Sequence, residues 1–142
     1  MHEKDTDKLV HSLKKAEDFH TIFSETRQYT IDQTLKTYLA YWLSEKHVSK
    51  STVLKKAGIA EATGYQYFDG KRNPSREKVI ALMIGLGLTL EDSNELMKKT
   101  GYAQLYPKHP WDAVVIYGIT HSLTISEIDD YLYSEGLKTF GE

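Results

Sequence analysis

The segment from Ser49 to Pro74 leaves this chain few ways to fold. Its apolar residues follow a helical spacing that breaks at Gly58 and resumes about two residues later. The second run stops at Asp69-Gly70, and the basic pair Lys71-Arg72 follows. Two helices joined by a turn of about three or four residues that contains Gly are typical of a helix-turn-helix. We therefore expect two short helices here, separated by a tight turn at Gly58.

Most of the remaining chain also carries apolar residues at helical spacing, and only three prolines interrupt it. We expect an amphipathic N-terminal helix over residues 5–23, followed by a polar linker to residue 30. Further helices are predicted over about 32–45, 76–86, 90–99, 111–121 and 125–135, with N-caps at Asp32, Ser75, Thr89 and Thr124. Gly85 and Gly87 are predicted to close the 76–86 helix. No segment alternates convincingly with period two, so the sequence predicts an all-α protein.

The predicted elements divide the chain into three parts. Residues 1–30 hold the N-terminal amphipathic helix and linker, residues 31–100 form a five-helix domain that contains the helix-turn-helix, and residues 101–142 form a C-terminal helical extension. The two C-terminal helices either extend the core of the five-helix domain or form a dimer interface. The N-terminal helix, with an apolar stripe from Leu9 to Phe23, is a second candidate for a homodimer contact.

The composition excludes several kinds of site. There is no cysteine, so disulfides, thiolate metal sites and cysteine nucleophiles are ruled out. The six histidines include no i, i+4 pair, and neither a nucleophile elbow nor a phosphate loop is present. We therefore predict no metal, no cofactor and no enzymatic activity. No apolar run approaches the roughly 18 residues needed to cross a bilayer, and the N-terminus lacks the apolar core of a secretory signal. We expect a cytoplasmic protein with no membrane partner.

The net charge of −2 conceals an asymmetry along the chain. Residues 46–78 carry eight Lys or Arg against three acids, whereas residues 79–142 carry four Lys against nine acids. A basic middle beside an acidic C-terminal half is expected where one surface meets phosphate and another does not. Lysines on a solvated helix face would give the same counts without any partner.

Three stretches carry a family resemblance. They are Gly58-Ile59 at the turn, the run Gly70-Lys71-Arg72-Asn73-Pro74-Ser75 after the second helix, and the segment from Leu82 to Asp92. Together they resemble the lambda-repressor-like (XRE/Cro) DNA-binding family, whose members commonly read Gly-Lys-x-x-Pro-Ser at the second of these places. The resemblance covers roughly half of the chain. It implies a five-helix fold over residues 31–100 whose second helix of the pair enters the major groove of double-stranded DNA.

The resemblance also implies which residues would touch DNA. The base-contacting positions are Glu61, Ala62, Tyr65 and Gln66, and the phosphate-contacting positions are Lys50, Thr63, Lys71 and Arg72. At the groove, Gln66 suits adenine, Ala62 suits a thymine methyl and Glu61 suits the cytosine amino group. No arginine is available for guanine, and the carboxylate of Glu61 opposes the approach of phosphate.

Two positions depart from the family pattern. Leu54 stands where the family usually has a small residue, and Gly64 stands where a buried aliphatic is expected. Glycine inside a helix costs about 1 kcal/mol relative to alanine. We hypothesise that the two departures are one change, in which Leu54 fills the space that Gly64 vacates.

Two functions therefore remain open for this fold. The first is a sequence-specific transcriptional regulator that occupies an operator, with Lys50, Lys71 and Arg72 holding phosphates. The second is a non-catalytic adaptor that retains the helix-turn-helix and uses its exposed aromatic helix to bind a protein partner. If the unit is only a helical scaffold, Tyr65, Tyr67 and Phe68 are packing residues.

Overall fold

A computed structural model describes residues 31–141, with side chains from Leu35 onward. Within this range the chain forms seven α-helices and no strand, so the predicted all-α class is confirmed. The helices are α3 (Ile31–Lys46), α4 (Lys50–Ala57), α5 (Glu61–Phe68), α6 (Arg76–Leu86), α7 (Leu90–Lys99), α8 (Pro110–Thr120) and α9 (Ile125–Ser134). The amphipathic helix predicted over residues 5–23 and its linker lie outside the described residues.

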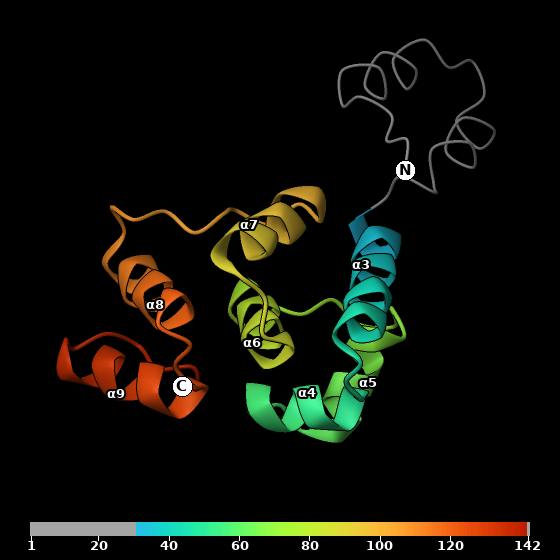
Figure 1. The fold of residues 1–142 in the computed structure, drawn as a ribbon, viewed down its shortest axis with the longest axis horizontal. Helices are drawn as coiled ribbons and strands as arrows, with labels where there is room; N and C mark the ends of the chain where they lie inside the picture. The colour runs from blue at the N-terminus through green and yellow to red at the C-terminus, as the bar shows by residue number, and fades with distance from the viewer. Residues whose placement is uncertain (1–30, 142) are drawn as a thin grey trace, which may run out of the picture.

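Helix α6 lies at the centre of the molecule, with α3 on one side and the pair α8–α9 on the other (Figure 1). Seven of its 11 residues are buried, which matches the rule that a helix apolar on all sides belongs in a core. Its most extensive packing is against α4, and it also contacts α3 and α7. The first helix of the predicted pair is therefore seated directly on the core.

Three glycines inside helices mark the places where neighbouring helices approach most closely. A Cβ added to Gly85 of α6 would lie 2.6 Å from the backbone oxygen of Val53 in α4. A Cβ on Gly64 would overlap the side chain of Leu54, and one on Gly118 would overlap Ile128 of α9. The hypothesis that Leu54 occupies the space beside Gly64 is thus confirmed. The prediction that Gly85 helps to close α6 is wrong, because Gly85 is an internal packing position and the chain leaves the helix at Gly87.

All seven of these helices end in the same way. Each helix is followed by a residue with positive φ. The backbone N–H of the next residue then donates to the carbonyl five residues earlier, as Ile59 does to Leu54 at 3.0 Å after Gly58. This is the Schellman arrangement, which satisfies carbonyls that a helix end leaves unpaired. Five of the positive-φ residues are glycine, but His47 (φ 52°) and Ser122 (φ 56°) carry side chains.

The helix starts largely follow the expected N-caps. Ser75 and Thr89 accept bonds from Lys78 N and Asp92 N, and Thr124 forms a full capping box with Glu127. The cap predicted at Asp32 is wrong, because α3 already includes Ile31 and Asp32 lies inside the helix. Local signals fix a boundary only to within one or two residues.

One hydrophobic cluster joins residues from both sides of position 100. Leu35 and Leu39 of α3, Val115 of α8, and Ile128 and Leu132 of α9 are all buried in the same cluster as α6. The two C-terminal helices therefore extend the core, which was one of the two interpretations of their apolar sequence.

Candidate nucleic-acid interface

The turn between α4 and α5 is built by backbone geometry and a shared apolar seam. Gly58 adopts φ 70°, a conformation that a Cβ would penalise, and so lets the chain reverse directly after α4. The seam residues predicted from the sequence, Val53, Ala57, Ile59 and Tyr67, are all buried. Helix α5 is consequently fixed relative to α4 by packing on both sides of the turn.

The predicted base-contacting residues share the outer face of α5. Gly64, Tyr67 and Phe68 turn the other face of this helix into the core. The residues on the outer face are exposed, and they are Glu61, Ala62, Tyr65 and Gln66. Thr63, predicted to contact phosphate, is half-buried in the first turn of the helix. The structure thus brings all four base-contacting candidates together on one accessible strip.

Two of the predicted phosphate-contacting cations follow α5 immediately. The backbone N–H groups of Lys71 and Arg72 both donate to the carbonyl of Gln66, at 3.0 and 3.3 Å, which fixes the direction of the turn. Both side chains are exposed. Lys50, the first residue of α4, is half-buried. These three cations therefore flank the exposed strip of α5.

Two contacts at this surface could not be predicted from the sequence. The hydroxyl of Ser51 donates to Oε1 of Glu61 at 2.8 Å, which holds that carboxylate against the start of α4. The ammonium of Lys50 lies 3.9 Å from Oδ1 of Asp69 and 5.8 Å from the centre of the Phe68 ring. Both contacts join residues on different helices, so no spacing along the chain signals them.

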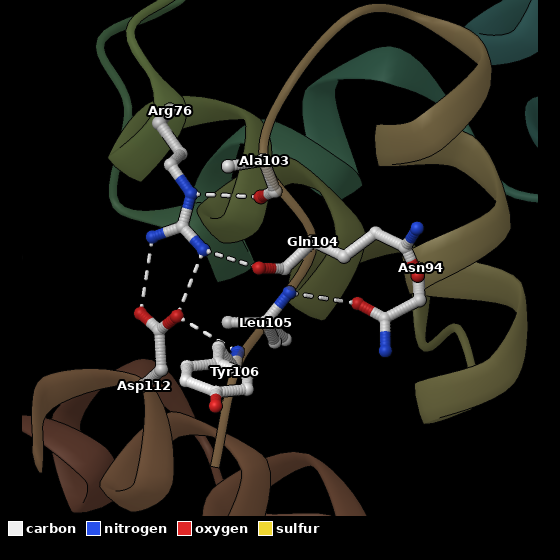
Figure 2. A network of polar contacts seen from close by, with 7 residues as sticks. All are labelled: Arg76, Asn94, Ala103, Gln104, Leu105, Tyr106 and Asp112. Carbon is white, nitrogen blue, oxygen red and sulfur yellow. Dashed lines mark hydrogen bonds and ion pairs between the residues drawn. The ribbon is translucent and has the colours of Figure 1, made fainter. Parts of the chain in front are cut away.

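Arg76 belongs to the basic segment in sequence, but its partly exposed guanidinium is occupied by contacts within the protein (Figure 2). Its guanidinium donates to both carboxylate oxygens of Asp112, at 3.0 and 2.9 Å. It also donates to the carbonyls of Ala103 and Gln104, at 2.9 and 3.0 Å. The basic cluster read from the sequence over residues 46–78 therefore contributes one cation fewer to the surface.

The carboxylate of Asp112 is buried, and both of its oxygens accept hydrogen bonds. Asp112 is 5% exposed and also accepts the N–H of Tyr106 at 2.9 Å. Burial raises the pKa of Asp112, but the hydrogen bonds from Arg76 and Tyr106 and the Arg76 charge outweigh it and hold that pKa below the ordinary 3.8. The ion pair therefore stays charged and connects the start of α6 to α8.

The turn that carries Lys71 and Arg72 is also anchored by the segment between α7 and α8. Pro74 is buried, and its carbonyl accepts the hydroxyl of Tyr102 at 2.7 Å. Tyr102 follows α7, so this bond and the Arg76 network both tie the turn to the segment between α7 and α8.

No protein-family model, curated protein or solved structure matches the chain.

Two further surface features come from the C-terminal helices. An open cleft runs between α4 and the start of α9, with Lys55, Lys56, Ile84, Ile125 and Asp130 among its lining residues. Beside it, the ring of Tyr117 stacks on His121 at 4.1 Å and meets Tyr131 edge-on at 5.5 Å.

Over residues 31–141 no group of three acidic or histidine side chains is placed to hold a metal, and no helix there is long and apolar enough to cross a membrane.

Proposed function

We propose that this chain is a sequence-specific DNA-binding transcriptional regulator in which α4 and α5 form a lambda-repressor-like helix-turn-helix. The observation that carries the proposal is the outer strip of α5. Its inner face is held in the core through Gly64, Tyr67 and Phe68, while its outer face is free. A rigidly mounted helix with one free face and flanking cations is what a major-groove reader requires.

The outer strip supplies chemistry suited to base edges. The Gln66 amide can donate to and accept from adenine together, and the Ala62 methyl suits the thymine methyl group. The carboxylate of Glu61 can accept from the cytosine amino group, and its position is fixed by the Ser51 hydroxyl. Tyr65, 38% exposed, adds an aromatic surface on the same strip.

The flanking cations supply the sequence-independent part of binding. Lys71 and Arg72 extend from a turn whose backbone is fixed by the Gln66 carbonyl, and Lys50 and Thr63 lie near the starts of α4 and α5. Each phosphate that such a cation neutralises releases counterions from the DNA. For each neutralised phosphate, the logarithm of the binding constant therefore falls by about 0.9 for a tenfold rise in salt concentration. Regulation follows from occupation of an operator, without catalysis or a cofactor.

A regulator of this kind reads two half-sites about one helical turn apart, which calls for a twofold homodimer. We propose that the dimer forms through the exposed side of α8 and α9 or through the N-terminal segment 1–30. Exposed tyrosines on the C-terminal side support the first location, among them Tyr117, Tyr131 and Tyr133.

The adaptor is retained as a second function because the outer strip of α5 includes the exposed ring of Tyr65, and α8 and α9 carry further exposed tyrosines. Tyr133 is 77% exposed, and Tyr117 and Tyr131 are each nearly half exposed. Tyrosine is enriched at protein interfaces because it combines a large apolar ring with a hydrogen-bonding end. In this role α5 would meet a protein instead of DNA.

Fluorescence anisotropy with the full-length protein separates the two functions. The labelled duplexes are the DNA upstream of its own gene and a random sequence of equal length, each at about 50 and 200 mM salt. Tight binding that favours the upstream DNA and weakens steeply with salt supports the regulator. Absence of binding to both duplexes at the lower salt overturns it, and a pull-down then tests the adaptor.

A further inference from the structure

Asp69 occupies a position where its charge does not help the fold. It is the C-cap of α5, and its backbone N–H bonds to the Tyr65 carbonyl. The C-terminal end of a helix carries partial negative charge, so an acidic side chain there is unfavourable. Its own carboxylate is roughly half exposed.

The placement of Asp69 is explained better by its neighbours at the surface. Its carboxylate pairs with the ammonium of Lys50 across the α4–α5 boundary at 3.9 Å. Lys71 and Arg72 follow it by two and three residues in the exposed turn. One acid therefore contacts one of the predicted phosphate-contacting cations and precedes the other two closely in the sequence.

The other acid of this surface behaves differently. Glu61 is held by the neutral hydroxyl of Ser51 at 2.8 Å, so it neutralises no cation. Asp69 alone, among the acids on α5 and the turn after it, is paired with a predicted phosphate-contacting residue.

We propose that Asp69 is a built-in competitor for DNA phosphate at Lys50, and that it limits the affinity of the protein for DNA of any sequence. This inference rests on the proposed function, because it concerns how that same surface is regulated. In the free protein the Lys50 ammonium lies 3.9 Å from the Asp69 carboxylate and 5.8 Å from the centre of the Phe68 ring. Binding to a phosphate replaces the Asp69 contact, so only the difference between the two contacts contributes to affinity. Because phosphate contacts carry no sequence information, the effect applies equally to operator and non-operator DNA.

The test uses four full-length proteins: the wild type, Asp69→Asn, Lys50→Met and the double variant. Asparagine keeps the shape of Asp69 and removes its charge, and Met keeps the apolar stem of Lys50 against Phe68. Anisotropy titrations are made on the upstream and the random duplex at about 50 and 200 mM salt. Glu91→Gln, an exposed charge removal on α7, is the matched control for net charge.

We expect Asp69→Asn to tighten binding to both duplexes by about threefold at the lower salt, a size consistent with an exposed ion pair. The gain should disappear in the Lys50→Met background and should not be reproduced by Glu91→Gln. Circular dichroism melts of each variant verify that the fold is kept.

Two results would overturn the inference while leaving the regulator intact. One is equal affinity of the wild type and Asp69→Asn, and the other is an equal gain with and without Lys50. A third result, no binding of any variant to either duplex, would remove the inference together with the proposed function.

Discussion

His47 and Ser122 each hold a backbone conformation that penalises a Cβ. Their φ values of 52° and 56° lie in the left-handed region, which costs a non-glycine residue about 1–2 kcal/mol. The other five helix ends use glycine at the same place. Strain of this kind is a local property that one substitution can remove.

We predict that Ser122→Gly stabilises the protein by about 0.5–1 kcal/mol, because the released strain exceeds the extra freedom that glycine gives the unfolded chain. His47→Gly should act in the same direction. Urea denaturation measures the free energy of unfolding, and Ser126→Gly, inside α9, is the matched control. The control should lose about 0.5 kcal/mol, the difference between serine and glycine in a helix. Destabilisation by Ser122→Gly would contradict the role assigned to its φ angle.

The Arg76–Asp112 pair should be the most sensitive polar contact in the described part of the chain. Removing Arg76 leaves a buried carboxylate without its cation, so we predict that Arg76→Met lowers the free energy of unfolding by about 3 kcal/mol. Lys138→Met, which breaks the exposed pair with Glu77, is the control and should change stability by less than about 1 kcal/mol. Equal effects of the two substitutions would show that the Arg76 network adds nothing specific.

The same pair also predicts a pH dependence. The folded pKa of Asp112 is lowered, so its contribution to stability is complete above the unfolded pKa of about 3.9 and is lost as the pH falls through the folded value. Unfolding measured between pH 7 and pH 3 should therefore show a smaller acid-dependent loss for Asp112→Asn than for the wild type. Parallel pH profiles would contradict this assignment.

At the residue scale, the features that the sequence predicts correctly are helix caps and turns, which depend on residues close together in the chain. The caps at Ser75 and Thr124 and the left-handed Gly58 follow from short signals that involve only adjacent turns. Arg76 was counted with the basic cluster because its partner lies 36 residues away, and nothing in its neighbourhood marks it as inward-facing.

At the element scale, α4 is held between α5 and α6 by two glycine contacts. Leu54 fills the space beside Gly64, and the Val53 carbonyl lies against Gly85. We predict that Gly64→Ala destabilises the protein by about 1–3 kcal/mol, because the added Cβ overlaps Leu54 in a packed core. A double-mutant cycle with Leu54→Ala should show the two costs to be less than additive. A stabilising Gly64→Leu with Leu54 intact would contradict the pairing.

Helix α5 and the turn after it carry the test of the proposed base reading. We predict that Gln66→Ala mainly relaxes sequence preference, because it removes a base-edge contact. Lys71→Ala or Arg72→Ala should weaken binding to all duplexes and reduce the salt slope by about one each. Lys108→Ala, an exposed lysine in the turn before α8, is the matched control and should leave both quantities unchanged. Equal loss on every duplex for Gln66→Ala would contradict its place in the groove.

The sequence could specify the elements of this surface but not its ion pairs. The turn signals at Gly58 and Gly70 bound the second helix of the pair, and the family resemblance implies that Gln66 and Tyr65 face outward from it. Both residues are exposed. The pairing of Lys50 with Asp69 depends on how α4 and α5 cross, which tertiary packing decides.

At the scale of the whole molecule, α8 and α9 belong to the same packed unit as α6, which follows the turn that carries Lys71 and Arg72. Val115 and Ile128 share the core cluster of α6. The ion pair between Arg76 of α6 and Asp112 of α8 adds a polar contact between the same two parts. The sequence left open whether these helices extend the core, because apolar periodicity shows that a face is buried without showing against what.

The hydrogen bond from Tyr102 to the Pro74 carbonyl has a consequence for how the protein opens. Together with the Arg76 network, it ties the start of α6 to the segment between α7 and α8. Helix α8 itself cannot detach without breaking the Arg76–Asp112 ion pair. We predict that the slowest-exchanging amides of α8 and α9 share one opening free energy with those of α6, equal to that of global unfolding. Hydrogen-exchange NMR with increasing denaturant measures this, and earlier exchange in α8 and α9 would identify them as a separate cooperative unit. A shared value would mean that the turn carrying Lys71 and Arg72 is anchored only while α6, α8 and α9 remain packed together.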